Sequence, residues 1–179
     1  LYTRFFEFPV PRVIDLLQRV RVGLPETRLL VVGKGFSGEE DELLQLAEQA
    51  GLAEDVEYAG WVEPAQLPGF FGRASVAIYP YDDTLINRAK CAVKLLDLLA
   101  AGVPVVAEAV GQNRECIRHG ETGWLVPPGD PALFAEAIVR LMKDARLAQR
   151  LGESALKDVR ERFGWDRLAD VVERAYKPL

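Results

Sequence analysis

Short apolar runs alternate along this chain with longer segments in which apolar residues recur at helical spacing. The short runs indicate strands at residues 1–4, 27–32, 56–59, 76–79, 103–107 and 125–126. The longer segments indicate helices at about residues 11–22, 43–50, 64–74, 90–101, 114–118, 131–142, 145–159 and 166–176. Because right-handed crossovers return the chain in the same direction, this alternation predicts an α/β fold with a doubly wound, Rossmann-like parallel sheet. In the common strand order the first and fourth strands are neighbours, so the loops after them face one crevice.

Length and charge narrow the classes of function. A chain of 179 residues is long enough for one domain with a sizeable core and too short for two ordinary domains, so we expect a single domain over residues 1–179. No stretch is long and apolar enough to span a membrane. The net charge of −5 gives no general basic field for nucleic acid, so any anion site must be local. The two cysteines, Cys91 and Cys116, lack the spacing of a zinc or redox motif, which favours a reducing compartment.

A glycine motif is the first candidate phosphate site. Gly33, Gly35 and Gly38 spell G-x-G-x-x-G between an expected strand and helix, with Glu54 and Asp55 at the distance of a ribose contact. However, the four acidic residues after the last glycine fill the first turn of the helix, where they neutralise its dipole and would repel a pyrophosphate. The motif also follows the second strand, whereas a dinucleotide fold uses the first. We therefore expect an ordinary glycine turn here.

The better candidate follows the fourth strand. On a single helix, Lys90, Lys94 and Asp97 would lie at i, i+4 and i+7, forming one polar stripe on an otherwise apolar cylinder. At the start of that helix, the free backbone N–H groups of residues such as Val93 would favour a phosphate for the same reason. The alternative is a narrow solvated face near a domain edge.

Two arginines are expected at the same crevice. Arg4 leaves the first strand and Arg12 begins the first helix, so four cations would converge under the assumed strand order. Arginine offers a planar fork to phosphate oxygens, whereas lysine offers a point charge, and a diphosphate can use both. Asp97 has two interpretations, as an acceptor for ribose hydroxyls or as an i, i+3 partner of Lys94.

The order and spacing of several further segments resemble a known family. The chain resembles the donor-binding half of retaining GT-B glycosyltransferases, the large group typified by the glycosyl transferases group 1 domain. Each segment alone is a weak signal, but together they span almost the whole chain. The matching segments are residues 29–35, 58–62, 100–107, 110–115, 120–130 and 162–165.

The resemblance assigns roles to matching positions. It implies that Arg4 and Arg12 contact the donor diphosphate, with Arg12 standing where the family usually has lysine and placed there by a short insertion. Lys90, Lys94 and the backbone of Val93 join them as expected diphosphate ligands.

The nucleoside is expected beside this diphosphate site. The resemblance implies that Gly60, Trp61 and Val62 border the nucleobase through backbone groups. Asp97 would hold the ribose, in place of the glutamate that ends the family's E-x7-E motif.

The chain departs from the family at the first glutamate of that motif. The position falls at Ala89, which has no carboxylate, although this glutamate usually contacts the transferred sugar. Lys90 and Asp82 are the candidates for part of its task, so the vicinity of the donor sugar is assigned to Asp82 and Ala89.

The expected function is therefore the nucleotide-sugar-binding half of a retaining glycosyltransferase that transfers a hexosyl group to a glycan, lipid or other acceptor. The cations would stabilise charge that develops on the leaving nucleoside diphosphate, a role that requires no metal and no cofactor. The acceptor-binding N-terminal domain would lie outside this chain, which alone would transfer little or nothing. The helix at residues 166–176 would cross back toward that domain and expose an apolar patch.

Two alternatives remain open at this point. A nucleotide-sugar epimerase of GT-B type would share the diphosphate grip, but it needs acid and base residues that the sequence does not show. A stand-alone nucleotide-sugar-binding subunit would pair with a separate acceptor-binding chain.

A cytoplasmic location is expected, at the inner face of the membrane if the other half associates with lipid. We interpret His119 as a solvated turn residue rather than a general base, and Cys91 as a small core residue.

Overall fold

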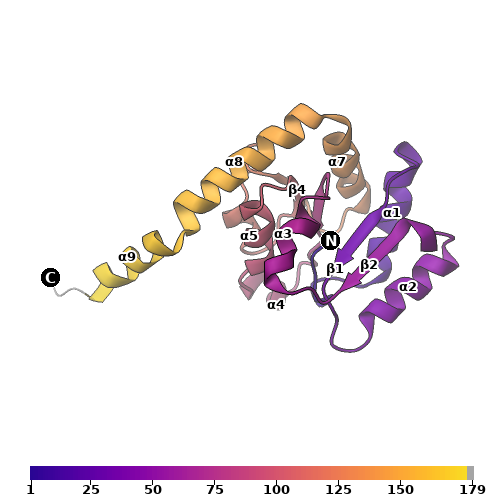
Figure 1. Cartoon of the computed structure of the whole chain (residues 1–179), viewed down its shortest axis with the longest axis horizontal. Coiled ribbons are helices and arrows are strands. Elements are labelled where there is room, and N and C mark those ends of the chain that lie inside the picture. The colour runs from indigo at the N-terminus through magenta and orange to yellow at the C-terminus, as the bar shows by residue number, and fades with distance from the viewer. Residues whose placement is uncertain (177–179) are drawn as a thin grey trace.

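The computed structural model describes residues 1–176 and confirms an α/β fold with parallel strands and flanking helices (Figure 1). One sheet pairs β1 (Leu29–Val32) with β2 (Val56–Gly60), and the other has the order β3 (Ala77–Tyr79), β4 (Val105–Glu108), β5 (Trp124–Val126). Every ladder is parallel. The strands β3 and β4 are buried along their whole length, as expected for strands covered on both faces.

Helices connect and cover these strands. They are α1 (Pro11–Gly23), α2 (Glu39–Gln49), α3 (Leu67–Phe71), α4 (Leu85–Ala89), α5 (Val93–Ala100), α6 (Asn113–Cys116), α7 (Pro131–Lys143), α8 (Ala145–Phe163) and α9 (Trp165–Tyr176), with single 3₁₀ turns at Ala53–Asp55 and Pro64–Gln66. Local sequence explains several starts. Proline occupies the first turn of α1 and α7, and aspartates cap α7 and α8 by accepting backbone N–H groups.

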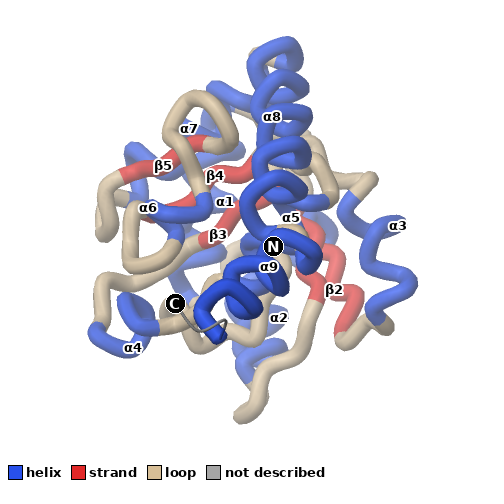
Figure 2. The backbone as a smooth tube through the Cα atoms, turned by 90° about the vertical axis from the view of Figure 1, so that its left-hand side faces the viewer, coloured by secondary structure: helices blue, strands red, loops and turns tan. Residues whose placement is uncertain are grey.

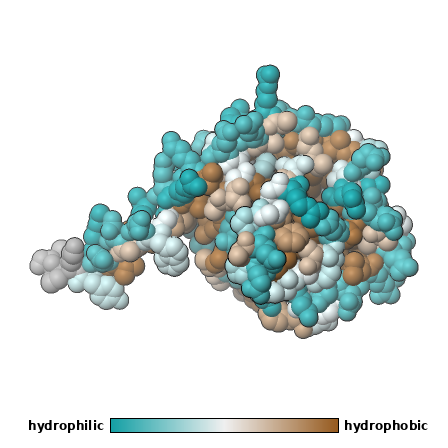
Figure 3. Space-filling view, in the orientation of Figure 1, coloured by the Kyte–Doolittle hydropathy of each residue, from teal (hydrophilic) through white to brown (hydrophobic). Residues whose placement is uncertain are grey.

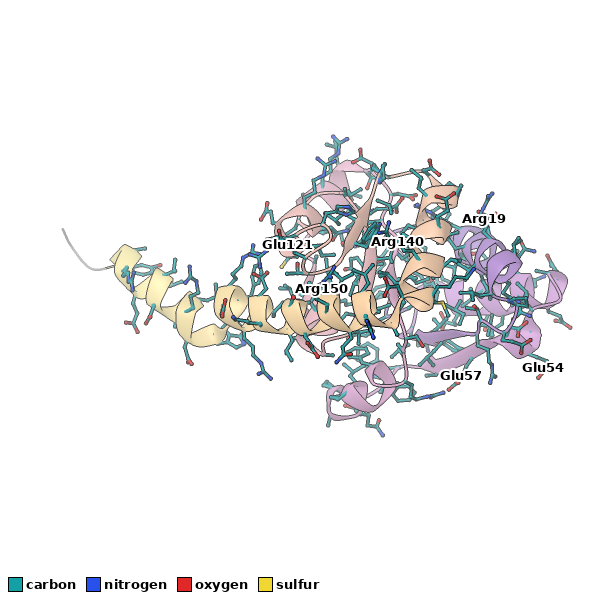
Figure 4. All side chains as sticks on the ribbon, turned by 90° about the horizontal axis from the view of Figure 1, so that it is seen from above. Arg19, Glu54, Glu57, Glu121, Arg140 and Arg150 are labelled. Atoms are coloured by element: carbon teal, nitrogen blue, oxygen red, sulfur yellow. The ribbon has the colours of Figure 1, made fainter. Side chains whose placement is uncertain are left out.

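The core has two parts. One joins α1, β1, α2 and α7, and the other joins β3, β4, α5 and α8. Helix α8 approaches α5 closely at Gly152, where an added Cβ would lie 2.1 Å from the carbonyl oxygen of Gly102. Charged side chains such as Arg150 on α8 and Glu57 on β2 are at the surface (Figure 4).

The first expected strand is reduced to one bridge. Tyr2 pairs in parallel with Val32, and the α-amino group of Leu1 donates to the carbonyl oxygen of Leu30 at 2.8 Å. Within residues 1–176, no backbone ladder joins this segment to β3. The first and fourth expected strands instead line a largely apolar cavity of about 340 Å³, together with α1, β1 and α3. The two segments therefore lie at the same cavity, as neighbours would, but without a backbone ladder between them in residues 1–176.

The long helix expected to carry both lysines is also interrupted. Lys90 is extended (φ −74°, ψ 145°), so the lysines sit on either side of a break between α4 and α5. Asn87, within α4, ties that helix to the neighbouring loops, because its buried side chain donates to the carbonyl oxygens of Glu7 (2.8 Å) and Asp82 (2.9 Å). The expected i, i+4 relation of Lys90 and Lys94 on one helix is wrong, and the expected loop before it contains α4.

Helix α9 projects away from the rest of the molecule (Figure 1), and it therefore lies in front of the body when that side faces the viewer (Figure 2). None of its residues is buried, and both hydrophobic and hydrophilic residues lie on the surface of this arm (Figure 3). The expected apolar patch is present at Trp165, Leu168, Val171, Val172 and Tyr176. Among residues 1–176, no helix combines the length and apolar character that a bilayer crossing needs.

Candidate functional site

Three cations from separate segments act on one another. Arg4 follows the bridge at Tyr2, Lys90 follows α4, and Lys94 lies in the first turn of α5. Burial lowers the pKa of the Lys94 amine, and repulsion from Lys90 and Arg4 lowers it further. The carboxylates of Glu7 and Asp97 act in the opposite direction. Two expected diphosphate ligands, Lys90 and Arg4, are thus within electrostatic reach of the third, Lys94.

Aromatic rings, rather than an acid, surround Arg4. Its guanidinium carbon lies 4.0 Å from the ring centre of Phe36 and 5.4 Å from that of Trp61. Phe36 stacks on Phe6 with ring centres 5.2 Å apart. Arg4 Nε is buried and has no hydrogen-bond partner within residues 1–176. Cation–π contacts hold a guanidinium in place without neutralising it, so its charge remains available to an anion.

Lys90 has a carboxylate partner that sequence reasoning missed. Its Nζ donates to Glu7 Oε1 at 2.9 Å and lies over the rings of Phe6 (4.5 Å) and Tyr81 (5.6 Å). Glu7 is 5% exposed. Because 83 residues separate this pair in the sequence, no local pattern could have revealed it.

The first turn of α5 adds backbone donors to the cations. The helix is eight residues long and has no side-chain cap. The N–H of Ala92, just before the helix, donates to Gln112 Oε1 at 2.7 Å. The following amides, including those of Val93 and Lys94, belong to the turn whose N–H groups lack intrahelical acceptors. Their partial positive charge adds to that of the lysines.

Arg12 has different partners. It forms ion pairs with Asp82, at 2.5 Å, and with the fully buried Glu108. Glu108 also accepts the backbone N–H groups of Tyr81 (2.6 Å) and Gly129 (2.8 Å). This cluster ties α1 to β4 and to the loop before α7. Two carboxylates match the charge of Arg12, and Asp82 is engaged with it, so the assignments of Arg12 to the diphosphate and of Asp82 to the sugar stay predictions.

Asp97 does not form the i, i+3 pair with Lys94 within residues 1–176, and its role at the ribose stays a prediction. Its pKa is raised because burial penalises the charged form, although the nearby Lys94 acts in the opposite direction. Its carboxylate is therefore a hydrogen-bond acceptor beside the cations that is not neutralised by a direct contact.

The expected nucleobase border lies at the end of β2. The carbonyl oxygen of Gly60 accepts the N–H of Gly33 at 2.8 Å, Val62 is buried, and the exposed Trp61 is beside Arg4. Ala89 ends α4 and is exposed, directly before Lys90.

Glutamate carboxylates neutralise the backbone donors of the glycine motif, as the sequence indicated. Gly35 N–H donates to Glu40 at 3.1 Å and Ser37 N–H donates to Glu39 at 2.7 Å. Gly33 adopts φ 123°, and a Cβ there would lie 1.9 Å from the carbonyl oxygen of Thr3. The glycine thus permits close backbone approach, while two carboxylates occupy donors that a phosphate would need.

Three further side chains can be placed. His119 Nδ1 accepts a hydrogen bond from the N–H of Leu125 at 3.1 Å, and the centre of its ring lies 4.7 Å from that of Trp124. These contacts are consistent with a turn residue. Cys91 is exposed, so its interpretation as a core residue is wrong, because it lies in the break between helices. Cys116 is the buried thiol. Residues 1–176 contain no group of three or more His, Cys, Asp or Glu side chains arranged to hold a metal ion.

Comparison with solved structures defines the class of fold. The chain superimposes on sucrose-phosphate synthase from Thermosynechococcus elongatus with a TM-score of 0.85 and 25% identity, over 98% of this chain and 43% of that one. It also matches the Anabaena protein HepE in complex with UDP and glucose, with a TM-score of 0.79 and 20% identity, over 97% of this chain and 47% of that one. The fold is a Rossmann-like half of a GT-B glycosyltransferase.

Sequence comparison identifies the family. Residues 9–144 match the family described as glycosyl transferases group 1, and the chain belongs to it. A relative, phosphatidyl-myo-inositol mannosyltransferase from Mycobacterium leprae, is 32% identical over 165 residues, which cover 92% of this chain and 41% of the relative. The chain thus spans about two fifths of the length of that relative.

Proposed function

We propose that this chain is the donor-binding half of a retaining glycosyltransferase, and that it binds a nucleoside diphosphate sugar and presents its hexosyl group to an acceptor. The observation that carries the proposal is the arrangement of three cations near the uncapped start of α5. Lys90 lies over the ring of Phe6, which stacks on the Phe36 ring that Arg4 covers, and Lys94 lies in the first turn of the helix. A doubly charged diphosphate is the ligand that such a cluster complements. The relative named as a mannosyltransferase and the neighbour solved with UDP and glucose support this ligand class, and they favour a transferase over an epimerase.

The same groups account for a contribution to catalysis. As the glycosidic bond breaks, negative charge grows on the leaving diphosphate, and cations fixed in advance stabilise that charge most in the transition state. Arg4 offers a forked donor held by aromatic rings, and the two lysines offer point charges. Asp97 accepts from the ribose, and the segment at Trp61 borders the base. We propose that protein cations fill the role a metal ion has in other transferases.

The acceptor side is assigned to a second half, outside this chain. Two observations support that assignment. Helix α9 exposes an apolar face, and the chain spans only about two fifths of the length of the mannosyltransferase relative. We expect residues 1–179 alone to bind nucleotide without appreciable transfer. A cytoplasmic location is supported by the exposed free thiol of Cys91. Membrane association through the second half stays a prediction.

Nucleotide titration tests the proposal. Isothermal titration with UDP and with GDP compares the unchanged chain with Arg4→Ala, Lys94→Ala and the control Arg150→Ala, which removes an exposed arginine from α8. Each site variant is expected to lose about 1–3 kcal/mol, or roughly fivefold to 150-fold in affinity, the scale of a charge-assisted phosphate contact. The control is expected to bind as the unchanged chain does. Equal affinity in all four proteins would rule out this cluster as the diphosphate site.

A further inference from the structure

Glu7 holds a carboxylate oxygen with no partner. The residue is 5% exposed, Oε1 accepts from Lys90 Nζ at 2.9 Å, and Oε2 is buried without a hydrogen bond within residues 1–176. Burying a carboxylate is costly, and almost all buried polar atoms in proteins are hydrogen-bonded. This oxygen, beside the amine of Lys90, therefore lacks the donor that a buried carboxylate normally has.

The backbone holds this carboxylate in a fixed position. The carbonyl oxygen of Glu7 accepts from Asp82 N–H at 2.9 Å and from the side chain of Asn87 at 2.8 Å. Just upstream, Phe5 adopts φ 66° and its N–H donates to Thr3 Oγ1 at 2.8 Å. A non-glycine residue in the left-handed region costs free energy and persists only where its surroundings impose it. The turn thus orients Glu7 in advance rather than leaving it on a mobile loop.

The location of Glu7 matches a gap in the sequence motif. Its charge acts on Lys94 and on the hydroxyls of Tyr79 and Tyr81, whose pKa values are raised chiefly by burial and further by Glu7. Its direct partner is Lys90, the residue next to Ala89. A carboxylate from the first loop thus reaches the neighbourhood of the position where the E-x7-E pattern lacks its first carboxylate.

We propose that Glu7 accepts hydrogen bonds from hydroxyl groups of the transferred sugar, an inference that rests on the proposed function. A bound diphosphate competes with Glu7 for Lys90, since both are anions beside the same amine. Once Lys90 turns to the phosphate, both oxygens of Glu7 lack partners, and two neighbouring hydroxyls satisfy them. The substrate class is a nucleoside diphosphate hexose with a vicinal diol on the face toward Glu7.

The test compares sugar-bearing and sugar-free ligands. Titration calorimetry measures UDP against UDP-glucose and GDP against GDP-mannose, for the unchanged chain, Glu7→Gln and the control Glu136→Gln, an exposed glutamate on α7. Glu7→Gln is expected to weaken the preferred nucleotide sugar about tenfold to hundredfold, the range for hydrogen bonds to a charged acceptor. Its affinity for the bare nucleoside diphosphate is expected to stay equal or to rise, because Lys90 is released.

Each other outcome has one meaning. Equal losses for the diphosphate and its sugar would show that Glu7 only positions Lys90, which overturns the inference. If the unchanged chain binds UDP or GDP but binds neither nucleotide sugar more tightly than its diphosphate, the inference about Glu7 is also overturned. The proposed diphosphate site is unaffected by that result. A chain that binds neither UDP nor GDP defeats the proposed function itself. Diphosphate binding reports folding of the variant, and if Glu7→Gln does not fold, Glu7→Asp, which withdraws the carboxylate by one methylene, must show the same selective loss.

Discussion

At the scale of single residues, two clusters of charged groups in this molecule differ in their partners. Arg12 and Glu108 neutralise each other in the interior, with Asp82 at the edge. Arg4 and Lys94 have no carboxylate in direct contact within residues 1–176. The first arrangement stabilises the fold, and the second leaves positive charge available to a ligand.

Glu108→Gln tests the structural cluster. The fully buried carboxylate accepts from Arg12 and from two backbone N–H groups, so removing its charge leaves a largely buried guanidinium without its inner partner. We expect a loss of about 3 kcal/mol in the free energy of unfolding, measured by urea denaturation. The matched control is Glu57→Gln, which breaks an exposed pair with Arg73 and is expected to cost no more than about 1 kcal/mol. Similar losses in both variants would contradict the distinction.

The two cysteines differ in reactivity. Burial raises the pKa of the Cys116 thiol from 9.0 to about 11, whereas Cys91 is exposed. At pH 8, iodoacetamide is expected to label Cys91 in the folded chain and Cys116 only after unfolding, as read by peptide mass spectrometry. Between pH 9 and about 11 the unfolded thiol loses its proton before the folded one, so Cys116 makes stability fall as pH rises. Prompt labelling of Cys116 in the folded chain would contradict its burial.

At the scale of elements, the packing of α8 on α5 depends on a missing side chain. Gly152→Ala would ordinarily stabilise a helix, by about 1 kcal/mol. Here the new Cβ would lie 2.1 Å from the carbonyl oxygen of Gly102. That oxygen belongs to the backbone, so relieving the clash would require the two chain segments to move apart. We expect a net loss of about 1–3 kcal/mol in the free energy of unfolding. Arg150→Ala, on an exposed face of the same helix, controls for composition, and a stabilised Gly152→Ala variant would show that the helices can separate without cost.

Elements set by local periodicity were predictable, and those set by distant contacts were not. The strand β4 and the helix α7 follow from an apolar run and from a capped amphipathic repeat. The break before α5 interrupts an apolar segment, so composition concealed it. The preceding helix α4 is tied by Asn87 to the carbonyl oxygen of Glu7, 80 residues earlier in the chain, a contact that no local pattern reveals. In the candidate site, the cations could be named from sequence. The ion pair of Lys90 with Glu7 could not, because it joins residues far apart in the chain.

At the scale of the whole molecule, α9 contributes little to the body from which it projects. It has no buried residue and leaves Trp165 85% exposed. A chain ending at Gly164 is therefore expected to unfold within about 1 kcal/mol of the full chain and to bind nucleoside diphosphates unchanged. Urea denaturation and titration of both chains provide the measurement. A large loss of stability would show that the helix packs on the body in solution.

The interrupted sheet has a consequence for how the interior opens. With no ladder joining β1 and β2 to the other three strands in residues 1–176, the two groups are held together mainly by side chains, with α1 packed on α7 between them. Side-chain packing can loosen on one side without breaking backbone bonds on the other. Amide hydrogens of Val31 and Tyr58 should then exchange with deuterium by partial opening, sooner than those of Val106. A strand that occupied the cavity and hydrogen-bonded to both groups of strands would make them exchange as one cooperative unit.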